Sequence, residues 1–569
     1  MPTPLKASTH NPEYVKYSGG GIDMLARIKT EGNCHTRLCV IEIKDENKAS
    51  ESQKTAMSQA ITYATFVAKL LTEQPDWMEF FMGHKTKRNR NSRCLDHFDI
   101  EVVTIMPEGI TETFENKVLE VPGTNFKLHC HSLYYNPQKF SETHNFEFSG
   151  TFLSEMRITV HRGSNQIGGC VTEYESNGWK LFVDYGEQLP GAPMSDKKLE
   201  IDGLTCGDLQ KSALLITHYH GDHIGKITEL PPELPIYMGK MAKEIASELA
   251  NHLSTVSVEH RKMAERLNNV NTFVPRKHFT FGEFDITPIV VDHSAFDAYA
   301  FCIEAKELKV FHTGDFRKHG FRSGKLSTVI ERYVERADHI VCEATNVNRP
   351  EATLIPEHEL QKDFEEAFTE NKYNVAYVSS TNIDRLFGLY HAAIRANRPF
   401  YVDAYQKRIM DIVAGRDKIW SKSSLYNYIE GKKPQKLIQR GTEFIANDKF
   451  IDFVSKHGYV LVARQGERFD KLLNQLPDEG RVKYLSMWNG YLDVSKAAYN
   501  PALAKSVGDD YRYMHTSGHC DMKSLDELIT ELDPKAIIPI HTDNPRAFAD
   551  LFCDKWPVIL LNDGEYFRL

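Results

Sequence analysis

Apolar and polar residues near the start of the chain alternate in a pattern that predicts strands packed around one helix. On both sides of the polar turn KTEGN, β-branched and apolar residues alternate with polar ones, which indicates two neighbouring strands. The stretch SESQKTAMSQAITYATFVAKLL then begins with serines suited to capping and repeats apolar residues at helical spacing. A further strand is indicated by FDIEVVTIMPEG. We therefore expect a small α/β domain over residues 1–150.

The pattern changes near Met156, where glycines separate the strands and the turn ESNGW closes a predicted hairpin. Later strands such as SALLITHYH, FDITPIVVDHS and LKVFHTGDF each end in His or Asp, and helical stretches lie between them. This alternation indicates a layered α/β architecture. Residues 346–500 hold another alternating set of strands and helices. We expect residues 151–345 and 501–569 to form one domain, and residues 346–500 to be an α/β domain inserted into it.

Composition places the chain among ordinary soluble proteins. Its 569 residues are too many for one hydrophobic core, and 41% are hydrophobic and 26% charged. No apolar run approaches the roughly 18 residues needed to cross a bilayer, and the first residues do not resemble a secretory signal. The ten cysteines are scattered singly, which favours reduced thiols in packing roles. These features predict a cytoplasmic protein with no membrane partner.

Charge limits the kind of nucleic-acid binding that the chain can perform. A net charge of −9 argues against a protein that coats nucleic acid without specificity, because that affinity comes from neutralised phosphates. The one dense basic run is Lys85–Arg93. We interpret it as a solvated loop, in slight preference to a loop that contacts phosphates.

The strongest chemical signal is THYHGDHIG, which places His218, His220, Asp222 and His223 at the end of an apolar strand. Imidazole nitrogen suits Zn²⁺, and a carboxylate among the histidines lets one short turn supply ligands to two adjacent ions. Two metals roughly 3.5–4 Å apart can lower the pKa of a bridging water and stabilise a pentavalent phosphate. A polar turn without a metal is disfavoured, because it would crowd these groups together without a cation.

Three further candidate ligands each follow an apolar strand, namely His293, Asp315 and His541. A lone histidine at a strand end is more often a surface or core residue than a ligand. These three residues therefore gain weight only from the first cluster.

The series HxHxDH, a later His, the Asp of TGD and a closing His resembles the motifs of the metallo-β-lactamase fold, from about Met156 to the C-terminus. That fold is an αββα sandwich. The resemblance implies two Zn²⁺ or Mn²⁺ ions, one held by His218, His220 and His293, the other by Asp222, His223 and His541, with Asp315 bridging them. It also implies that Asp184, in LFVDYGE, orients the metal-bound turn and is not a direct ligand.

More than two hundred residues separate Asp315 from His541, and this insertion resembles the β-CASP domain of nucleic-acid-processing members, above all ribonuclease J. The segment CEATNVNRPEATLIPEHEL resembles that family's entry into the insertion, with Glu357 at its acidic motif. The resemblance implies that His519, in TSGHCDMK, faces the scissile phosphate. Histidine at the position of His541 implies the branch that cuts RNA, since DNA-processing relatives tend to have valine there.

Two other features of the insertion allow two interpretations each. The turn VSSTNIDR resembles a Ser/Asn/Arg turn of the same family, and its polar side chains could cradle a 5′-phosphate or cap the next helix; they are Ser379, Ser380, Asn382 and Arg385. The aromatic pair Trp488 and Tyr491 could stack on an RNA base, but such a pair is more often part of a core, and we expect a core position.

The N-terminal module carries a second set of candidate residues. Asp23, Glu42 and Lys44 fall on two neighbouring predicted strands, where two carboxylates and an amine can share one Mg²⁺ site. This pattern resembles the PD-(D/E)XK nucleases, and Gln59 and Tyr63 match the QxxxY helix of part of that family. The alternative is a degenerate nucleic-acid-binding or structural domain.

These signals together predict a zinc-dependent ribonuclease in which a metal-bound hydroxide attacks the phosphorus. The expected catalytic residues of this site are Asp184, Asp222, Glu357 and His519. RNA is the expected substrate, and DNA is a candidate ligand of the N-terminal module. Two other functions stay open: a small-molecule hydrolase such as a thioesterase or lactonase, and an inactive scaffold that binds RNA.

Overall fold

The computed structural model divides the chain into two compact units, Met1–Glu155 and Met156–Leu569. It describes residues 24–29, 36–44, 52–73, 98–107, 116–124, 126–135, 148–149, 156–192, 199–306, 308–349, 354–414 and 424–569. Within these residues, no helix combines the length and the apolar character that a membrane crossing requires.

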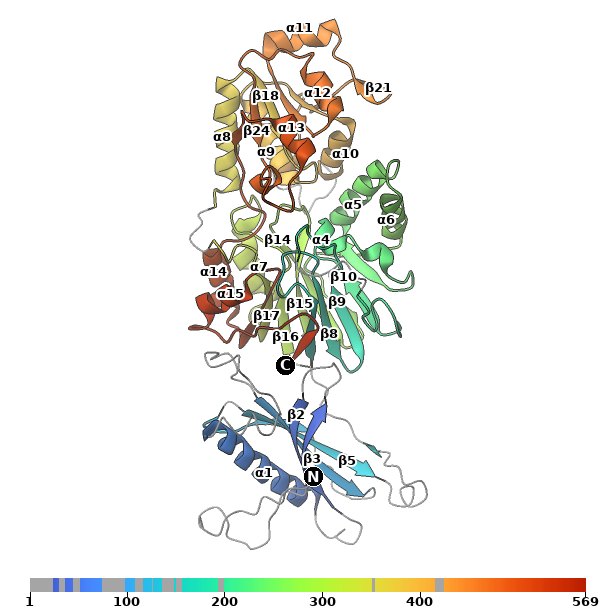
Figure 1. Ribbon diagram of the computed structural model, residues 1–569, viewed down its shortest axis with the longest axis vertical. Coiled ribbons are helices and arrows are strands. Elements are labelled where there is room, and N and C mark those ends of the chain that lie inside the picture. The colour runs from blue at the N-terminus through green and yellow to red at the C-terminus, as the bar shows by residue number, and fades with distance from the viewer. Residues whose placement is uncertain are drawn as a thin grey trace. The chain divides into compact units, whose positions relative to one another are not determined.

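The described residues of the N-terminal unit form one mixed sheet with one long helix (Figure 1). The sheet order is β1-β2-β3-β5-β4, with β6 paired to β5. The strands are β1 (Met24–Lys29), β2 (Thr36–Ile43), β3 (Phe98–Pro107), β4 (Lys117–Glu120), β5 (Phe126–Tyr135) and β6 (Phe148–Ser149). Helix α1 (Gln53–Glu73) connects the parallel strands β2 and β3, as a parallel connection requires, and buries Met57, Ala64 and Ala68. The expected order of two strands, a helix and a strand is therefore present.

The second unit contains two sheets packed face to face. The first has the order β12-β11-β10-β9-β8-β7-β27. Its strands are β7 (Arg157–Arg162), β8 (Val171–Ser176), β9 (Trp179–Val183), β10 (Ser212–Leu215), β11 (Ile236–Gly239), β12 (Asn271–Phe273) and β27 (Glu565–Arg568). The other sheet has the order β13-β14-β15-β16-β17-β26. Its strands are β13 (Phe279–Phe281), β14 (Phe284–Val291), β15 (Ala298–Ala305), β16 (Leu308–His312), β17 (His339–Glu343) and β26 (Ala536–Ile540).

Helices cover the outer face of each sheet, which completes an αββα sandwich (Figure 1). Side chains of both sheets, such as Val183 and Phe301, share one buried cluster between the sheets. The outer helices beside the first sheet are α5 (Lys240–Leu253) and α6 (Val258–Asn268), and those beside the second are α7 (Leu326–Tyr333), α14 (Met522–Leu532) and α15 (Pro545–Phe552). Because β27 pairs with β7 and β26 with β17, the C-terminal segment completes both sheets.

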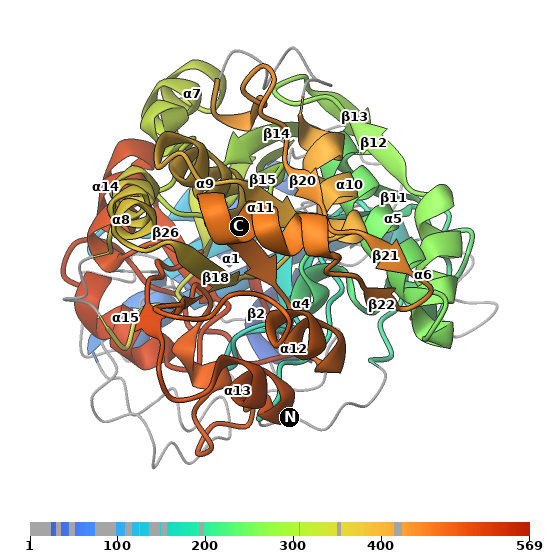
Figure 2. The same ribbon diagram turned by 90° about the horizontal axis from the view of Figure 1, so that it is seen from above.

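Between β17 and β26 the chain builds a separate parallel sheet with the order β20-β19-β23-β18-β24-β25. Its strands are β18 (Tyr373–Tyr377), β19 (Phe400–Val402), β20 (Gln435–Lys436), β23 (Tyr459–Ala463), β24 (Val482–Leu485) and β25 (Arg512–Tyr513). The helices are α8 (Glu357–Glu370), α9 (Ile383–Arg395), α10 (Ala404–Val413), α11 (Asp448–His457), α12 (Glu467–Leu473) and α13 (Pro501–Val507). Seen from above in Figure 2, α11 lies over this part of the chain. The expected boundary at residue 500 is wrong, because β25 belongs to the inserted sheet.

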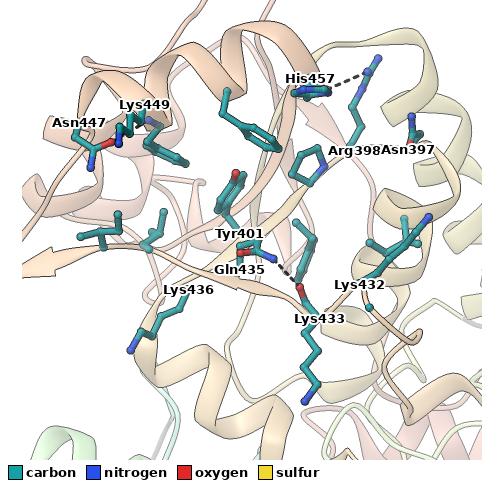
Figure 3. A pocket seen from close by; sticks show the side chains of 18 residues that line it. Asn397, Arg398, Tyr401, Lys432, Lys433, Gln435, Lys436, Asn447, Lys449 and His457 are labelled. Atoms are coloured by element: carbon teal, nitrogen blue, oxygen red, sulfur yellow. Dashed lines mark hydrogen bonds between the residues drawn. The ribbon is translucent and has the colours of Figure 1, made fainter.

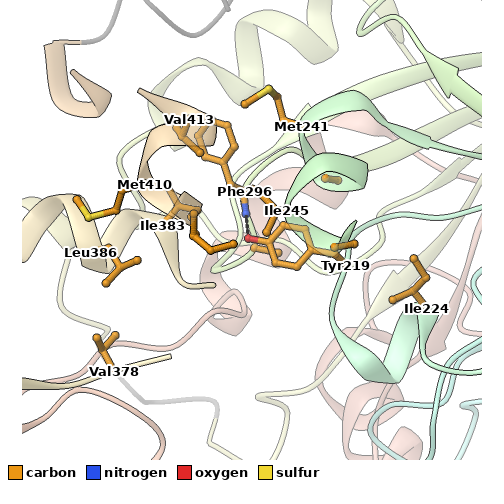
Figure 4. Close-up of a cluster of buried hydrophobic side chains, with 14 of the residues drawn as sticks. Tyr219, Ile224, Met241, Ile245, Phe296, Val378, Ile383, Leu386, Met410 and Val413 are labelled. Carbon is orange, nitrogen blue, oxygen red and sulfur yellow. Dashed lines mark hydrogen bonds between the residues drawn. The ribbon is translucent and has the colours of Figure 1, made fainter. Parts of the chain in front are cut away.

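One apolar cluster joins the insertion to the sandwich (Figure 4). Met241 and Ile245 of α5 belong to the same buried cluster as Ile383 of α9 and Met410 of α10. Tyr219 adds two hydrogen bonds at this junction: its hydroxyl donates to Thr381 O at 2.7 Å and accepts from Phe296 N at 2.8 Å. Tyr219 lies between two histidines of the candidate metal turn, so packing of the insertion holds that turn.

A buried group of ions makes the second link between insertion and sandwich. The guanidinium of Arg317 donates to Asp292 Oδ1 at 2.9 Å, to Glu357 Oε1 at 2.8 Å and to Asp384 Oδ2 at 2.7 Å. Asp292 and Arg317 belong to loops of the sandwich, whereas Glu357 begins α8 and Asp384 lies in the first turn of α9. Arg322 and Arg385 add positive charge to the same group, so the buried carboxylates are balanced.

We expect Arg317→Met to lower the free energy of unfolding by about 3–5 kcal/mol, because it leaves three buried carboxylates without their shared partner. The matched control is Arg336→Met, whose side chain is 79% exposed beside Asp533 and should change stability by less than about 1 kcal/mol. Urea denaturation followed by circular dichroism measures both. Equal midpoints for the two variants would contradict a structural role for the buried ions.

Candidate metal centre

The first candidate ligands lie in the turn after β10. The strand ends at Leu215, and the next residues lead into the short helix α4 (Gly221–Ile224), which carries Asp222 and His223. His218 and His223 are buried, and their ring centroids are 4.1 Å apart. One turn therefore presents several donor atoms to a single point at the end of the first sheet.

The predicted ligands form two neighbouring groups. Donor atoms of His218, His220 and His293 lie within 4.8 Å of one another, and so do those of Asp222, His223 and His541. In the first group His293 Nε2 is 3.2 Å from His220 Nδ1. In the second, His541 Nε2 is 3.3 Å from Asp222 Oδ2. His293 follows β14 and His541 follows β26, both in the second sheet, whereas the metal turn follows β10 of the first sheet, so both sheets contribute.

Asp315, which follows β16, lies between the two groups. Its Oδ2 is 3.9 Å from His218 Nε2 and 4.0 Å from His293 Nε2, on the side of the first group. The same oxygen is 3.1 Å from His223 Nε2 and 3.6 Å from His541 Nε2, on the side of the second. One carboxylate oxygen therefore occupies the position that a bridging ligand would need.

Neighbouring residues fix the orientation of these rings. Asp184, at the end of β9, accepts hydrogen bonds from Thr217 N at 2.8 Å and Thr217 Oγ1 at 2.8 Å, and its Oδ2 lies 2.7 Å from His223 Nδ1. Asp184 has a φ of 62°, a left-handed backbone conformation that is uncommon for a residue other than glycine. His293 Nδ1 is 2.6 Å from Gly518 O. Partners of this kind set which nitrogen of each ring faces a metal.

The structure adds Glu343, which the sequence analysis did not single out. Glu343 ends the apolar strand β17, and its Oε2 is 3.0 Å from His519 Nδ1. Donor atoms of Asp315, Glu343, His519 and His541 lie within 4.8 Å of one another. An acidic residue at the end of an apolar strand was the available signal, similar to the one that drew attention to Asp315.

Charges at the centre shift several pKa values. Burial lowers the pKa of His220 to about 4, and burial together with the neighbouring rings holds the pKa of His218 well below its usual range. Burial opposes ionisation of Asp315, but the nearby His541 and His223 outweigh it and lower its pKa. Burial would also lower the pKa of His519, but the charges of Glu343 and Asp315 raise it to about 9.

The donor set suits zinc. His218 Nε2 is buried and has no hydrogen-bond partner among the residues that the structure describes, although four charged or titratable groups surround it. A buried ring nitrogen in this state is costly unless a cation accepts its lone pair. Imidazole and carboxylate donors in two sets of three, with a shared carboxylate, match the ligands that zinc or manganese ions take in paired sites.

Two expected site residues have structural partners instead. Glu357 is buried, and both of its oxygens accept from Arg385 Nη2, at 2.9 and 3.1 Å. Burial opposes ionisation of Glu357, but Arg385 and Arg317 outweigh it and lower its pKa to about 2. Arg385 and Arg317 thus both pair with Glu357, and a catalytic role for Glu357 and phosphate binding by Arg385 stay predictions.

The rest of the VSSTNIDR turn also has local partners. Asn382 caps α9 by accepting from Arg385 N at 3.1 Å, so the capping interpretation describes this residue. Ser380 accepts from Gln406 Nε2 at 3.3 Å. Ser379 is exposed and bonds to Thr381 Oγ1 at 3.1 Å. No residue of this turn belongs to the metal groups among the described part of the chain.

The expected core position of Trp488 and Tyr491 is wrong. Trp488 directly precedes the one-turn 3₁₀ helix Asn489–Tyr491, and Tyr491 ends it. The side chain of Trp488 is 43% exposed and that of Tyr491 is 39% exposed. The two rings meet edge to face, with centroids 5.6 Å apart. Burial and then the charge of Asp222 raise the pKa of Tyr491, which places this residue near the second ligand group.

In the N-terminal unit, part of the second candidate site can be located. Lys44 Nζ donates to Glu42 Oε1 at 2.9 Å and to Gln59 Oε1 at 2.9 Å. Glu42 and Lys44 are both buried. Asp23 lies outside the described residues, as does the basic run Lys85–Arg93.

Comparison with protein families supports the fold. Residues 208–369 match the family model described as a beta-lactamase superfamily domain. Residues 510–560 match the model described as a Zn-dependent metallo-hydrolase RNA specificity domain. The two models cover the turn that holds His218 and the strand before His541.

Curated relatives and one solved structure point the same way. Ribonuclease J of Helicobacter pylori strain B128 is 23% identical over 80% of this chain and 65% of its own length. Ribonuclease J of Sinorhizobium meliloti is 23% identical over 68% of this chain and 69% of its own length. This chain thus spans about 65% of the length of the Helicobacter relatives that it matches. A crystal structure of a protein of unknown function from Enterococcus faecalis V583 shares the fold, with a TM-score of 0.58 and 20% identity over 73% of this chain and all of its own.

The αββα sandwich, the inserted parallel sheet and these matches lead to one conclusion. The chain contains a beta-lactamase superfamily domain and a Zn-dependent metallo-hydrolase RNA specificity domain, and its sequence is similar to those of ribonuclease J proteins.

Proposed function

We propose that the centre formed by the predicted ligands is a two-metal site, for zinc or manganese, that hydrolyses phosphodiester bonds of RNA. The observation that carries this proposal is the position of Asp315 Oδ2, within 4.0 Å of ring nitrogens from both ligand groups. RNA as the substrate is supported by the RNA specificity model that matches residues 510–560, and by the relatives named ribonuclease J.

Two bound ions would supply Lewis-acid charge and lower the pKa of a water between them. Other residues of the chain hold and orient the side chains that would bind the ions. Asp184 fixes His223 and Thr217, and Gly518 fixes His293, so the donors keep their directions when substrate enters. Asp222 and Asp315 supply negative charge that would keep the ions in place.

His519 is suited to contact the scissile phosphate. Its side chain is 22% exposed, whereas that of His541 is 1% exposed. Glu343 and Thr345 lie within hydrogen-bonding distance of Nδ1 of His519. The other ring nitrogen, Nε2, can therefore contact a substrate. The charge of Glu343 favours the protonated form of this ring against burial, and a cationic imidazole would stabilise negative charge that develops on phosphate oxygens.

Trp488 and Tyr491 are suited to stack on a base of the bound RNA. Both rings are partly exposed, and Tyr491 lies near Asp222. Aromatic rings beside a phosphate site bind bases with little sequence preference. This pair would position the strand beside the metals.

A second activity is proposed for the N-terminal unit, namely a Mg²⁺-dependent site that acts on nucleic acid, with DNA as the candidate substrate. The contacts of Lys44 with Glu42 and Gln59 favour it, because they join the ExK pair on β2 to the QxxxY helix α1. A carboxylate oxygen suits Mg²⁺, and a nearby lysine can polarise water. The alternative is a domain that binds nucleic acid without cutting it.

We expect the purified full chain to cleave 5′-labelled RNA, and a chelator followed by buffer exchange to abolish that cleavage. Addition of Zn²⁺ or Mn²⁺ should restore it, because the donors remain in place. Thioester and lactone substrates serve as controls for the small-molecule alternative. Hydrolysis of either one without cleavage of RNA would contradict the proposed substrate.

His519→Ala and His541→Ala should separate phosphate contact from metal binding. His519→Ala should keep the metal content and reduce RNA cleavage by about 10²-fold or more, because it removes a charge near the transition state. His541→Ala should reduce both, because it removes a donor of the second group. Elemental analysis and single-turnover kinetics measure the two effects. Equal metal loss in both variants would show that these roles are assigned wrongly.

The two units should act independently. Asp222→Ala should abolish RNA cleavage, whereas Lys44→Ala should leave it within about twofold, since the residues belong to different compact units. If the N-terminal site acts, Lys44→Ala should instead remove a Mg²⁺-dependent cleavage of DNA that the Asp222→Ala protein retains. Loss of RNA cleavage in folded, zinc-loaded Lys44→Ala protein would refute this independence.

A further inference from the structure

The inserted domain has a large hollow at the edge of its sheet, separate from the metal centre (Figure 3). Its volume is about 720 Å³, and it lies between the edge strand β20, the end of α9 and the helix α11. Sites for small ligands usually have volumes of roughly 300–1,000 Å³. No candidate metal ligand and neither His519 nor Tyr491 lines it. The hollow is therefore large enough for a ligand of its own.

Its polar lining is positively charged. Six side chains that are cationic or can become so line the hollow, and no acidic side chain does; the six are Arg398, Lys432, Lys433, Lys436, Lys449 and His457. Among the described residues, none of the four lysines forms an ion pair. Uncompensated positive charge in a concave surface attracts anions, and phosphate most of all where several lysines converge.

Arg398 is fixed in place without using a carboxylate. Its Nε donates to Phe368 O at 3.1 Å, and its Nη1 donates to His457 O at 3.4 Å. Backbone carbonyl groups therefore orient the guanidinium but do not neutralise its charge. An oriented, uncompensated guanidinium favours phosphate as a ligand.

Aromatic rings form part of the wall. Phe453 is 48% exposed, and its ring lies 4.6 Å from that of His457 at an angle of 34°. Tyr401 meets Phe450 edge to face at 5.1 Å deeper in the hollow. Water solvates an exposed phenyl ring poorly, and the ring offers a face on which a nucleic-acid base can stack.

A second hollow of similar size shows that this charge pattern is not general. That hollow, of about 770 Å³ between α5 and α10, contains both signs of charge. Arg408 pairs there with Glu248 at 2.5 Å, and Lys407 pairs with Asp411 nearby. Acidic side chains therefore line this hollow and one of them pairs with Arg408, unlike the lining of the hollow beside β20.

We propose that the hollow beside β20 is a second RNA-binding site, which takes phosphates on its lysines and a base on Phe453. It would hold a distant part of the same strand whose other part lies in the metal centre, and so it rests on the proposed ribonuclease function. Its expected effect is on the affinity for long RNA and not on the chemical step.

The test uses the full chain carrying Asp222→Ala, so that RNA is bound but not cut. Fluorescence anisotropy with a labelled 30-nucleotide RNA compares Lys432→Glu/Lys436→Glu with the control Arg261→Glu/Lys262→Glu on α6, which makes the same change in charge at exposed positions. The pocket variant should raise Kd at least tenfold and flatten the salt dependence, whereas the control should change Kd less than threefold. Phe453→Ala should raise Kd about fivefold or more with the salt dependence unchanged.

Equal Kd values for pocket and control variants, in proteins with equal thermal unfolding midpoints, would overturn the proposal. The proposal would also be overturned if the pocket variant lost binding of AMP but kept binding of RNA, because the hollow would then be a site for free nucleotides only. With Asp222 restored, the pocket variant should raise KM for long RNA and leave kcat unchanged, and cleavage of a six-nucleotide RNA should not change.

The same measurements separate this proposal from the ribonuclease function. A wild-type protein that cuts no RNA, combined with loss of RNA binding in the pocket variant, would refute the ribonuclease and support the second site. A wild-type protein that cuts RNA, combined with equal RNA binding by all variants, would support the ribonuclease and refute the second site.

Discussion

The candidate metal centre depends on imidazole and carboxylate groups that lie close together at the ends of strands from both sheets. Five histidines and two aspartates meet there, and Asp315 Oδ2 lies within 4.0 Å of four of the rings. Burial disfavours the charged carboxylates, and the unpartnered Nε2 of His218 adds a further cost. Cations at this point would balance both. Metal binding at this site would therefore stabilise the fold.

The inserted domain is tied to that site by contacts of two kinds. Apolar packing reaches Tyr219, which lies between His218 and His220, and the buried Arg317 joins the loops after β14 and β16 to α8 and α9. The same loops carry His293 and Asp315. A strand bound on the insertion would thus be held relative to the metals by a packed, charge-balanced junction, and the partly exposed ring of Tyr491 lies near the second ligand group.

Much of this site was predictable because its ligands follow one rule, a His or Asp directly after an apolar strand. The two groups and the intermediate position of Asp315 agree with the sets that the sequence motifs implied. Glu343 also lies at the end of an apolar strand, but it is a glutamate and stands outside those motifs. The neutralisation of Glu357 by Arg385 and the exposure of Trp488 depend on which distant segments meet, and local sequence carries no signal for that. The end of the insertion was misplaced because β25 has only two residues.

The central claim is that two metal ions share Asp315, and anomalous diffraction at the zinc absorption edge tests it most directly. Crystals of the zinc-loaded full chain should show two peaks roughly 3.5–4 Å apart, one beside His218, His220 and His293 and the other beside Asp222, His223 and His541. Asp315 Oδ2 should lie between the peaks. A single peak, or two peaks of which only one contacts Asp315, would contradict the account.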